Sequence, residues 1–166
     1  MVLEDKTPSL LLDILVDEVE MIFHNVTFMV TDENGQLQER EMTVFKQRPP
    51  VRYTQSADEL PYPNVEVKLI QGEPSGDKNA KGRKVYHTLL VFGIKDYGEE
   101  AWKALFSMYE QVMMRFARNP RLGAFEETGE GMFENQADDT WPYYFFACTL
   151  NFLSPKLVRE DVDGLC

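Results

Sequence analysis

The chain has 166 residues, of which 43% are hydrophobic and 12% aromatic, and 17 basic against 28 acidic residues give a formal net charge of −11 at pH 7. This composition predicts one folded domain over residues 1–166 and excludes global disorder. The acidic excess argues against specific binding to nucleic acid or to an anionic membrane, because both need clustered Lys and Arg. It favours either plain solubility or a surface that repels nucleic acid passing nearby.

The sequence also predicts where the protein is made. No apolar run approaches the roughly 20 residues of a membrane span, and residues 1–6 lack the basic and apolar regions of a signal peptide. Cys148 lies in an apolar pattern and Cys166 is the last residue, so we expect no disulfide between them. We therefore expect synthesis in the cytoplasm with reduced thiols.

The first expected element is a helix. Thr7 is a suitable N-cap residue, and Pro8 takes the first helical position, where its missing N–H costs nothing. Apolar residues then recur at helical spacing and form one stripe. The stripe comprises Leu12, Leu15, Val16, Val19, Ile22 and Phe23.

Residues 26–46 are expected to form a hairpin arm. A strand at 26–31 leads to a turn at 32–35, which contains the strong hairpin signal Asn34-Gly35. The return strand at 37–46 is too polar to be buried on both faces. It predicts an edge strand or a protruding arm.

A connector at 51–63 ends in two prolines that favour extended backbone. An alternating strand starts at Val65, a polar loop is expected at 72–82, and another strand at 85–94. The continuous apolar run from Leu89 to Phe92 predicts a central strand covered on both faces.

The second helix is expected at 99–118, ended by Asn119-Pro120. Its expected core stripe comprises Trp102, Leu105, Phe106, Tyr109, Val112, Met113 and Phe116. Met108 and Met114 fall off this stripe, which predicts a surface or interface position for them.

The last strands are a weak one at 125–135 and a long aromatic one at 141–152, and a polar tail follows at 156–166. Counting by twos places one uniformly apolar face on the long strand. That face comprises Tyr144, Phe146, Cys148, Leu150 and Phe152. The order of elements predicts an α+β fold, with a mostly antiparallel β-sheet and two α-helices packed on it.

No residue pattern predicts catalysis, a cofactor or a metal ion. His24 and His87 have no Cys or second His at ligand spacing, and the pair Asp138-Asp139 does not match a calcium loop. The Gly-containing segment 72–78 lacks the ending of a phosphate-binding loop. We therefore expect a protein that is not an enzyme.

Aromatic residues beside prolines or at strand ends are the candidate contact residues for an oligomer or partner. They are Tyr53, Tyr62, Trp141, Tyr143 and Tyr144. Trp and Tyr concentrate binding energy at protein interfaces, although each of them alone is equally compatible with capping the end of a core.

The order of several short motifs resembles the tail terminator (tail completion) proteins of Gram-positive phages and prophages. The motifs are PYPNVEVKLIQG at 61–72, HTLLVFGI at 87–94, MYEQV at 108–112, NPRLGAFE at 119–126 and WPYYFF at 141–146. The resemblance covers roughly residues 40 to 162. It implies an α+β subunit that assembles into a six-fold ring in the virion tail, caps the tail tube and joins the head connector.

The resemblance implies self-association, a tail tube protein and a head–tail connector protein as partners, with no active site or cofactor. DNA would pass through the ring without being held. Two alternatives stay open at this stage. One is a head-closure or neck component of the same virion, and the other is a small acidic ligand-binding module or enzyme.

Overall fold

The computed structural model describes residues 8–50, 59–80 and 82–155. Thr7, Tyr53 and the expected polar tail at 156–166 lie outside these ranges. The helices are α1 (Pro8–Ile22), the short 3-10 helix η2 (Lys78–Ala80) and α3 (Ala101–Arg118). The strands are β1 (Thr27–Thr31), β2 (Leu37–Glu41), β3 (Thr43–Lys46), β4 (Asn64–Pro74), β5 (Lys84–Lys95), β6 (Arg121–Leu122), β7 (Phe125–Glu127), β8 (Phe133–Asn135) and β9 (Tyr143–Leu153).

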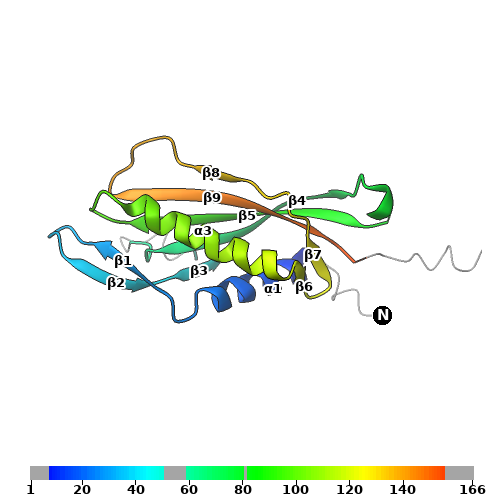
Figure 1. The fold of residues 1–166 in the computed structure, drawn as a ribbon, viewed down its shortest axis with the longest axis horizontal. Coiled ribbons are helices and arrows are strands. Elements are labelled where there is room, and N and C mark those ends of the chain that lie inside the picture. The colour runs from blue at the N-terminus through cyan, green and yellow to red at the C-terminus, as the bar shows by residue number, and fades with distance from the viewer. Residues whose placement is uncertain (1–7, 51–58, 81, 156–166) are drawn as a thin grey trace, which may run out of the picture.

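Two sheets form in the described chain. The larger sheet has seven strands in the order β3-β4-β5-β9-β7-β6, with β8 also paired to β9. Every pair in it is antiparallel except β3–β4, which is parallel. Strands β1 and β2 form a separate antiparallel hairpin. Figure 1 shows the long strands β4, β5 and β9 side by side, with α3 lying across them.

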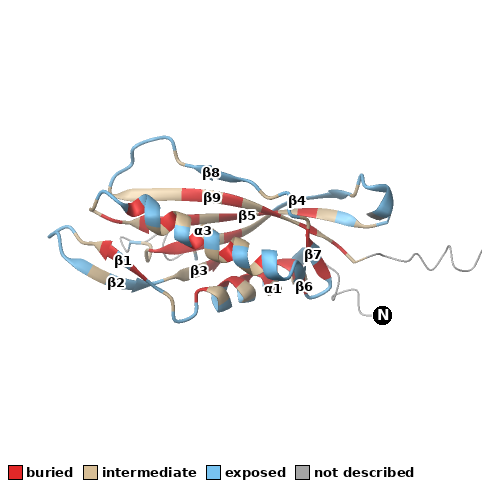
Figure 2. Ribbon diagram, viewed as in Figure 1, coloured by how far each residue is buried: buried red, intermediate tan, exposed pale blue. Residues whose placement is uncertain are grey.

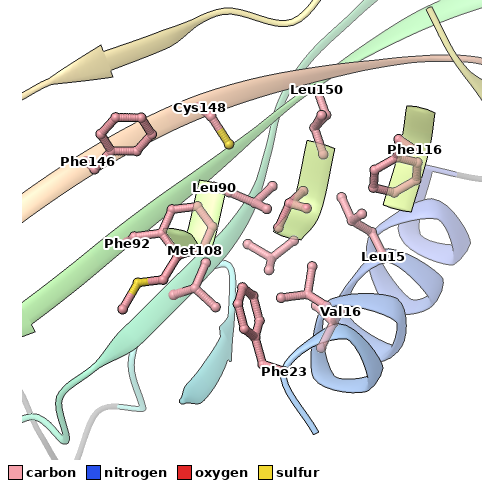
Figure 3. Packing of buried hydrophobic residues seen from close by; sticks show 14 of the residues in the cluster. Leu15, Val16, Phe23, Leu90, Phe92, Met108, Phe116, Phe146, Cys148 and Leu150 are labelled. Carbon is pink, nitrogen blue, oxygen red and sulfur yellow. The ribbon is translucent and has the colours of Figure 1, made fainter. Parts of the chain in front are cut away.

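The core lies between the large sheet and the two helices. Helix α1 packs on β3 and β4, helix α3 packs on β5 and β9, and the helices contact each other. The inward face of the sheet supplies Leu90 and Phe92 from β5 and the apolar residues of β9, as Figure 3 shows. This confirms the expected α+β fold, with helices on one face of a mostly antiparallel sheet.

The alternation read from β9 is confirmed. Phe146, Cys148, Leu150 and Phe152 are buried, whereas the residues between them are only half-buried. Cys148 is 1% exposed, and burial raises the pKa of its thiol to about 12. The α1 stripe is confirmed as well, with Leu11 as an additional buried member and Ile22 half-buried at its end.

Helix α3 is rotated relative to the expectation. Met108, expected at the surface, is fully buried, while Trp102, expected in the core, is 49% exposed. The buried residues of α3 are Ala101, Leu105, Met108, Val112 and Phe116. The difference arises because aromatic residues of α3 lie beside the buried face of the helix, not in it. They face β8, where Phe106 and Tyr109 contact Phe133.

Two expected boundaries are also wrong. The return strand of the arm divides at Met42, so that β2 stays with β1 while β3 joins the large sheet beside β4. The polar loop expected at 72–82 starts later, because β4 continues to Pro74 through pairs with β5. Strand β5 is central, but its second face, including Leu89 and Val91, is only half-buried.

The burial pattern follows this architecture. Figure 2 shows buried residues along the middle of β4, β5 and β9, and exposed residues along the projecting β4–β5 end and the turn between β1 and β2. No helix in the described ranges is both long and apolar enough to cross a membrane.

Candidate functional site

Three strands bring two of the candidate tyrosines together on the outer face of the sheet. Tyr62 lies just before β4, and Tyr143 at the start of β9 pairs with Lys95 at the end of β5. The ring centroids of Tyr62 and Tyr143 are 5.5 Å apart. Gly93 permits this packing, because a Cβ atom there would lie 3.2 Å from the Tyr62 ring and 3.1 Å from the Phe145 ring.

Glu59 connects the charged and aromatic groups of this cluster. Its carboxylate accepts hydrogen bonds from the Tyr143 hydroxyl and from Lys95 Nζ, which lies 2.9 Å from both oxygens. The Tyr143 and Lys95 donors hold the pKa of Glu59 below its ordinary value, and the same carboxylate raises the pKa of Lys95 and of Tyr143. At neutral pH the group is therefore an ion pair with a neutral tyrosine hydroxyl.

Trp141 extends the cluster to the loop after β5. Its ring meets that of Tyr97 edge-on at 5.2 Å, and its Nε1–H donates to the Tyr97 carbonyl oxygen at 3.4 Å. Lys95 Nζ lies 5.8 Å from the Tyr97 ring and 5.5 Å from the Tyr143 ring, so it links the two aromatic pairs. Trp141 is still 55% exposed, which leaves a large aromatic surface for a partner.

The structure therefore groups three of the five candidate residues, namely Tyr62, Trp141 and Tyr143. Tyr144 points to the opposite face of β9, where it packs against the core. Tyr53 lies outside the described residues. We call Glu59, Tyr62, Lys95, Tyr97, Trp141 and Tyr143 the tyrosine cluster.

The β1–β2 hairpin stands next to the tyrosine cluster, and a hollow of about 480 Å³ lies between them. Arg40 and Gln38 line it from the hairpin, and Glu59 and Lys95 from the cluster. The hairpin is held by Asp96, whose buried carboxylate accepts from the Thr31 backbone N–H at 3.1 Å and from that of Gly98 at 2.7 Å. The Thr31 carbonyl also accepts from the Tyr97 N–H at 3.0 Å, so both backbone groups of Thr31 tie the arm to the loop after β5.

The outer face of the hairpin carries exposed apolar side chains. Leu37 is 68% exposed and Met29 is 51% exposed, whereas Phe28 and Val30 on the inner face are buried. Strand β2 pairs only with β1 within the described chain, so its second edge is open. An open edge next to exposed apolar side chains can accept or donate a strand.

Sequence reasoning missed a second aromatic surface, between α3 and β8. Phe133 is 52% exposed and stacks on Phe146 at 5.4 Å, and Trp102 is 49% exposed and contacts Phe106. Met132, beside it, is 73% exposed. The available signal was the isolated Met132-Phe133 pair within an otherwise polar, Gly-containing segment.

Both ring nitrogens of the histidine in β5 contact side chains of neighbouring strands. His87 Nδ1 lies 2.7 Å from Asn151 Oδ1, and Nε2 lies 3.0 Å from Glu73 Oε1. The Glu73 carboxylate and the Asn151 amide raise the pKa of His87. In the described ranges, no three His, Cys, Asp or Glu side chains gather in a way that holds a metal ion.

No protein-family model matches the sequence, and no curated protein matches it significantly.

Proposed function

We propose that this chain is a ring-forming tail terminator of a phage or prophage tail. In this role it caps the tail tube, stops its growth and joins the tail to the head connector. The motif order described above suggests this role, and the α+β fold is the one that the resemblance implies. The work of such a subunit is contact with other proteins, and no chemical step is assigned to it.

The β1–β2 arm is the observation that carries this proposal. It is a separate two-stranded sheet held against the body by Asp96, with an open β2 edge and exposed Leu37 and Met29. A ring closes when two different patches of each subunit meet head to tail and the rotation returns to the start. The arm supplies one such patch, and strand addition supplies the contact.

The charge of the chain fits a ring around DNA. With a net charge of −11, the subunit repels phosphates and does not hold passing DNA by counterion release. The partners in this proposal are other copies of the chain, a tail tube protein and a head–tail connector protein. Assembly takes place in the bacterial cytoplasm, and the finished ring belongs to the virion tail.

Native mass across a concentration series, with negative-stain images of the same sample, tests the proposal. We expect a closed ring of about six copies with an open channel. A chain that stays monomeric at every concentration would contradict self-assembly. The hollow beside the tyrosine cluster would then be screened with metals and nucleotides by thermal shift.

A single substitution tests the arm. The Asp32 N–H donates to the Gln36 carbonyl at 2.8 Å, so alternation along the ladder directs the backbone groups of Gln38 towards β1 and those of Glu39 outwards. Glu39→Pro removes only an outward N–H, and we expect a folded monomer. Glu39→Thr keeps that N–H and should still form rings. Rings from both variants would exclude strand addition through β2.

A further inference from the structure

We propose that the acceptor for the arm is the free edge of β4 in a second copy of the chain. This inference rests on the proposed ring and names its second surface. The acceptor lies on the projecting part of the β4–β5 pair, which comprises residues 70–74 of β4, residues 84–87 of β5 and the loop between them. We call this part the ribbon.

Among the residues that the structure describes, no strand pairs with one edge of the ribbon. Strand β3 pairs with β4 only from Asn64 to Val67, and the Gln47 side chain then takes the place of a strand by accepting from the Leu69 N–H at 2.6 Å. Beyond that point β4 pairs only with β5 in the described chain, up to Pro74. The edge of residues 70–74 is therefore open to a further strand.

The backbone of this edge can form hydrogen bonds with a neighbour. The Ser75 N–H donates to the Arg83 carbonyl at 2.9 Å, so alternation along the ladder turns Glu73 towards β5 and Gly72 outwards. Gly72 thus offers both an N–H and a carbonyl group, and Pro74 offers a carbonyl group alone. Ile70, at the start of the edge, is 56% exposed and provides an apolar contact for Leu37 of the arm.

The arm and the ribbon lie at opposite ends of the molecule. Figure 1 shows the β1–β2 turn at one end of the long axis and the β4–β5 turn at the other. An arm therefore cannot reach the ribbon of its own chain. A contact between them joins two copies through different surfaces, which is the head-to-tail arrangement that closes into a ring.

Charge makes the two surfaces complementary. The arm carries four acidic residues and one basic residue, Arg40, between positions 32 and 41. The described residues of the ribbon and its loop, 71–80 and 82–84, carry three basic residues, Lys78, Arg83 and Lys84, against Glu73 and Asp77. A basic segment is unusual in a chain with net charge −11, and attraction to an acidic arm both steers encounter and sets the register.

Charge also argues against β8, another strand that pairs on one side only within the described residues. Strand β8 has exposed apolar neighbours, but Glu130, Glu134, Asp138 and Asp139 surround it and all are exposed. An arm with Glu33, Glu39 and Glu41 would meet like charges there. Of the two edges, the ribbon alone combines an apolar contact with opposite charge.

Disulfide trapping tests the contact on the full-length chain. In a Cys166→Ser background, the pair Leu37→Cys and Ile70→Cys should give, under mild oxidation, a ladder of covalent oligomers that extends to the ring size. Cys148 does not interfere because it is 1% exposed. The control pair Leu37→Cys and Met132→Cys places the second thiol beside β8, and it should give no ladder.

Charge reversal provides a second, independent readout. Lys78→Glu with Lys84→Glu, or Glu33→Lys with Glu39→Lys, should each raise the concentration needed for ring formation by about tenfold or more. The four substitutions together should restore assembly. Opposite charges face each other in both proteins, so added salt should weaken the wild-type ring and the restored ring to a similar degree.

The outcomes separate this inference from the proposed function. A wild-type chain that never forms rings overturns both. Wild-type rings that give no Leu37–Ile70 ladder, or whose assembly is unchanged by either charge reversal, overturn the ribbon as acceptor and leave the ring intact. A ladder from the β8 control pair alone would move the acceptor to β8.

Discussion

The two halves of the β4–β5 pair differ in their relation to solvent. In the first half of β4, Val65 and Val67 are buried opposite Phe92 and Leu90 of β5, where α1 packs on β4 and α3 packs on β5. The register then shifts between Leu69 and Gln71, and from Ile70 onwards β4 is exposed. The same two strands thus serve the core in one half and present an open edge in the other. Pairing between β4 and β5 along their whole length therefore does not give the two halves the same role.

The largest expected effect contrasts these halves directly. Phe92→Ala removes a fully buried ring and should lower the free energy of unfolding by about 3–5 kcal/mol. Ile70→Ala, on the exposed half, should change it by no more than about 0.5 kcal/mol. Urea unfolding of both variants measures the difference. Similar losses at the two positions would show that the ribbon belongs to the cooperative core.

An intermediate effect is expected where the two long helices meet. Arg115 pairs with Glu18 of α1 and donates to the carbonyl oxygens of Asn119 at 2.6 Å and Arg121 at 3.1 Å. Arg115→Met should lower the free energy of unfolding by about 1–3 kcal/mol, because it leaves Glu18 and two carbonyl groups without this donor.

The matched control for Arg115 is an exposed pair at the start of the same helix, between its N-cap residue and its first turn. Lys103 lies 2.9 Å from Glu100, and both side chains are more than half exposed. Lys103→Met should cost about 0.5 kcal/mol or less. Equal costs for Lys103→Met and Arg115→Met in the same urea experiment would mean that Arg115 does not join the helices.

The smallest effect concerns pH. Glu127 on β7 is 8% exposed, and in the described chain its Oε1 atom has no hydrogen-bond partner. Burial raises its pKa, because the charged carboxylate is poorly solvated there. Below the ordinary pKa of 4.5 the Glu127 carboxyl is protonated in both the folded and the unfolded protein, and the folded state keeps its full stability. This stability is lost as the pH rises through the raised pKa of Glu127.

Glu127→Gln removes this titration. The variant should gain stability over the wild type at pH 7.5 and gain less at pH 4.5, as measured by the urea midpoint at each pH. The neighbouring Glu126→Gln removes the same charge from an exposed site and serves as the control for the loss of a carboxylate. If the Glu127→Gln gain is equal at both values of pH, the carboxylate does not titrate in this range.

Local patterns predicted the elements well where one face of each element is buried. The alternation in β9, the Pro8 start of α1 and the Asn34-Gly35 turn each depend on neighbouring residues alone. The parallel β3–β4 pair depends on contacts between segments far apart in the chain, so the division at Met42 had no local signal. The extension of β4 through Gly72 was missed for the same reason, because the length of β4 depends on its pairing with β5.

The candidate site shows the same limit. Proline neighbours correctly marked Tyr62 and Trp141 as end-of-strand positions, and pairing across β5 and β9 brought Tyr143 to them. Side-chain direction then separated Tyr144 from Tyr143, which the alternation of β9 already indicated. The position of Trp102 needed the rotation of α3 about its axis. That rotation is fixed by Met108 and Phe116 packing on the sheet, which spacing alone does not determine.

The buried Cys148 thiol gives the protein a built-in reporter of its own motions. It lies in the middle of β9, under α3, and at neutral pH it is almost entirely in the unreactive thiol form. A thiol reagent therefore reaches it only when β9 and the helix separate. The rate of labelling in a Cys166→Ser chain would count these openings, and comparison of free subunits with assembled ones would reveal how far association suppresses them.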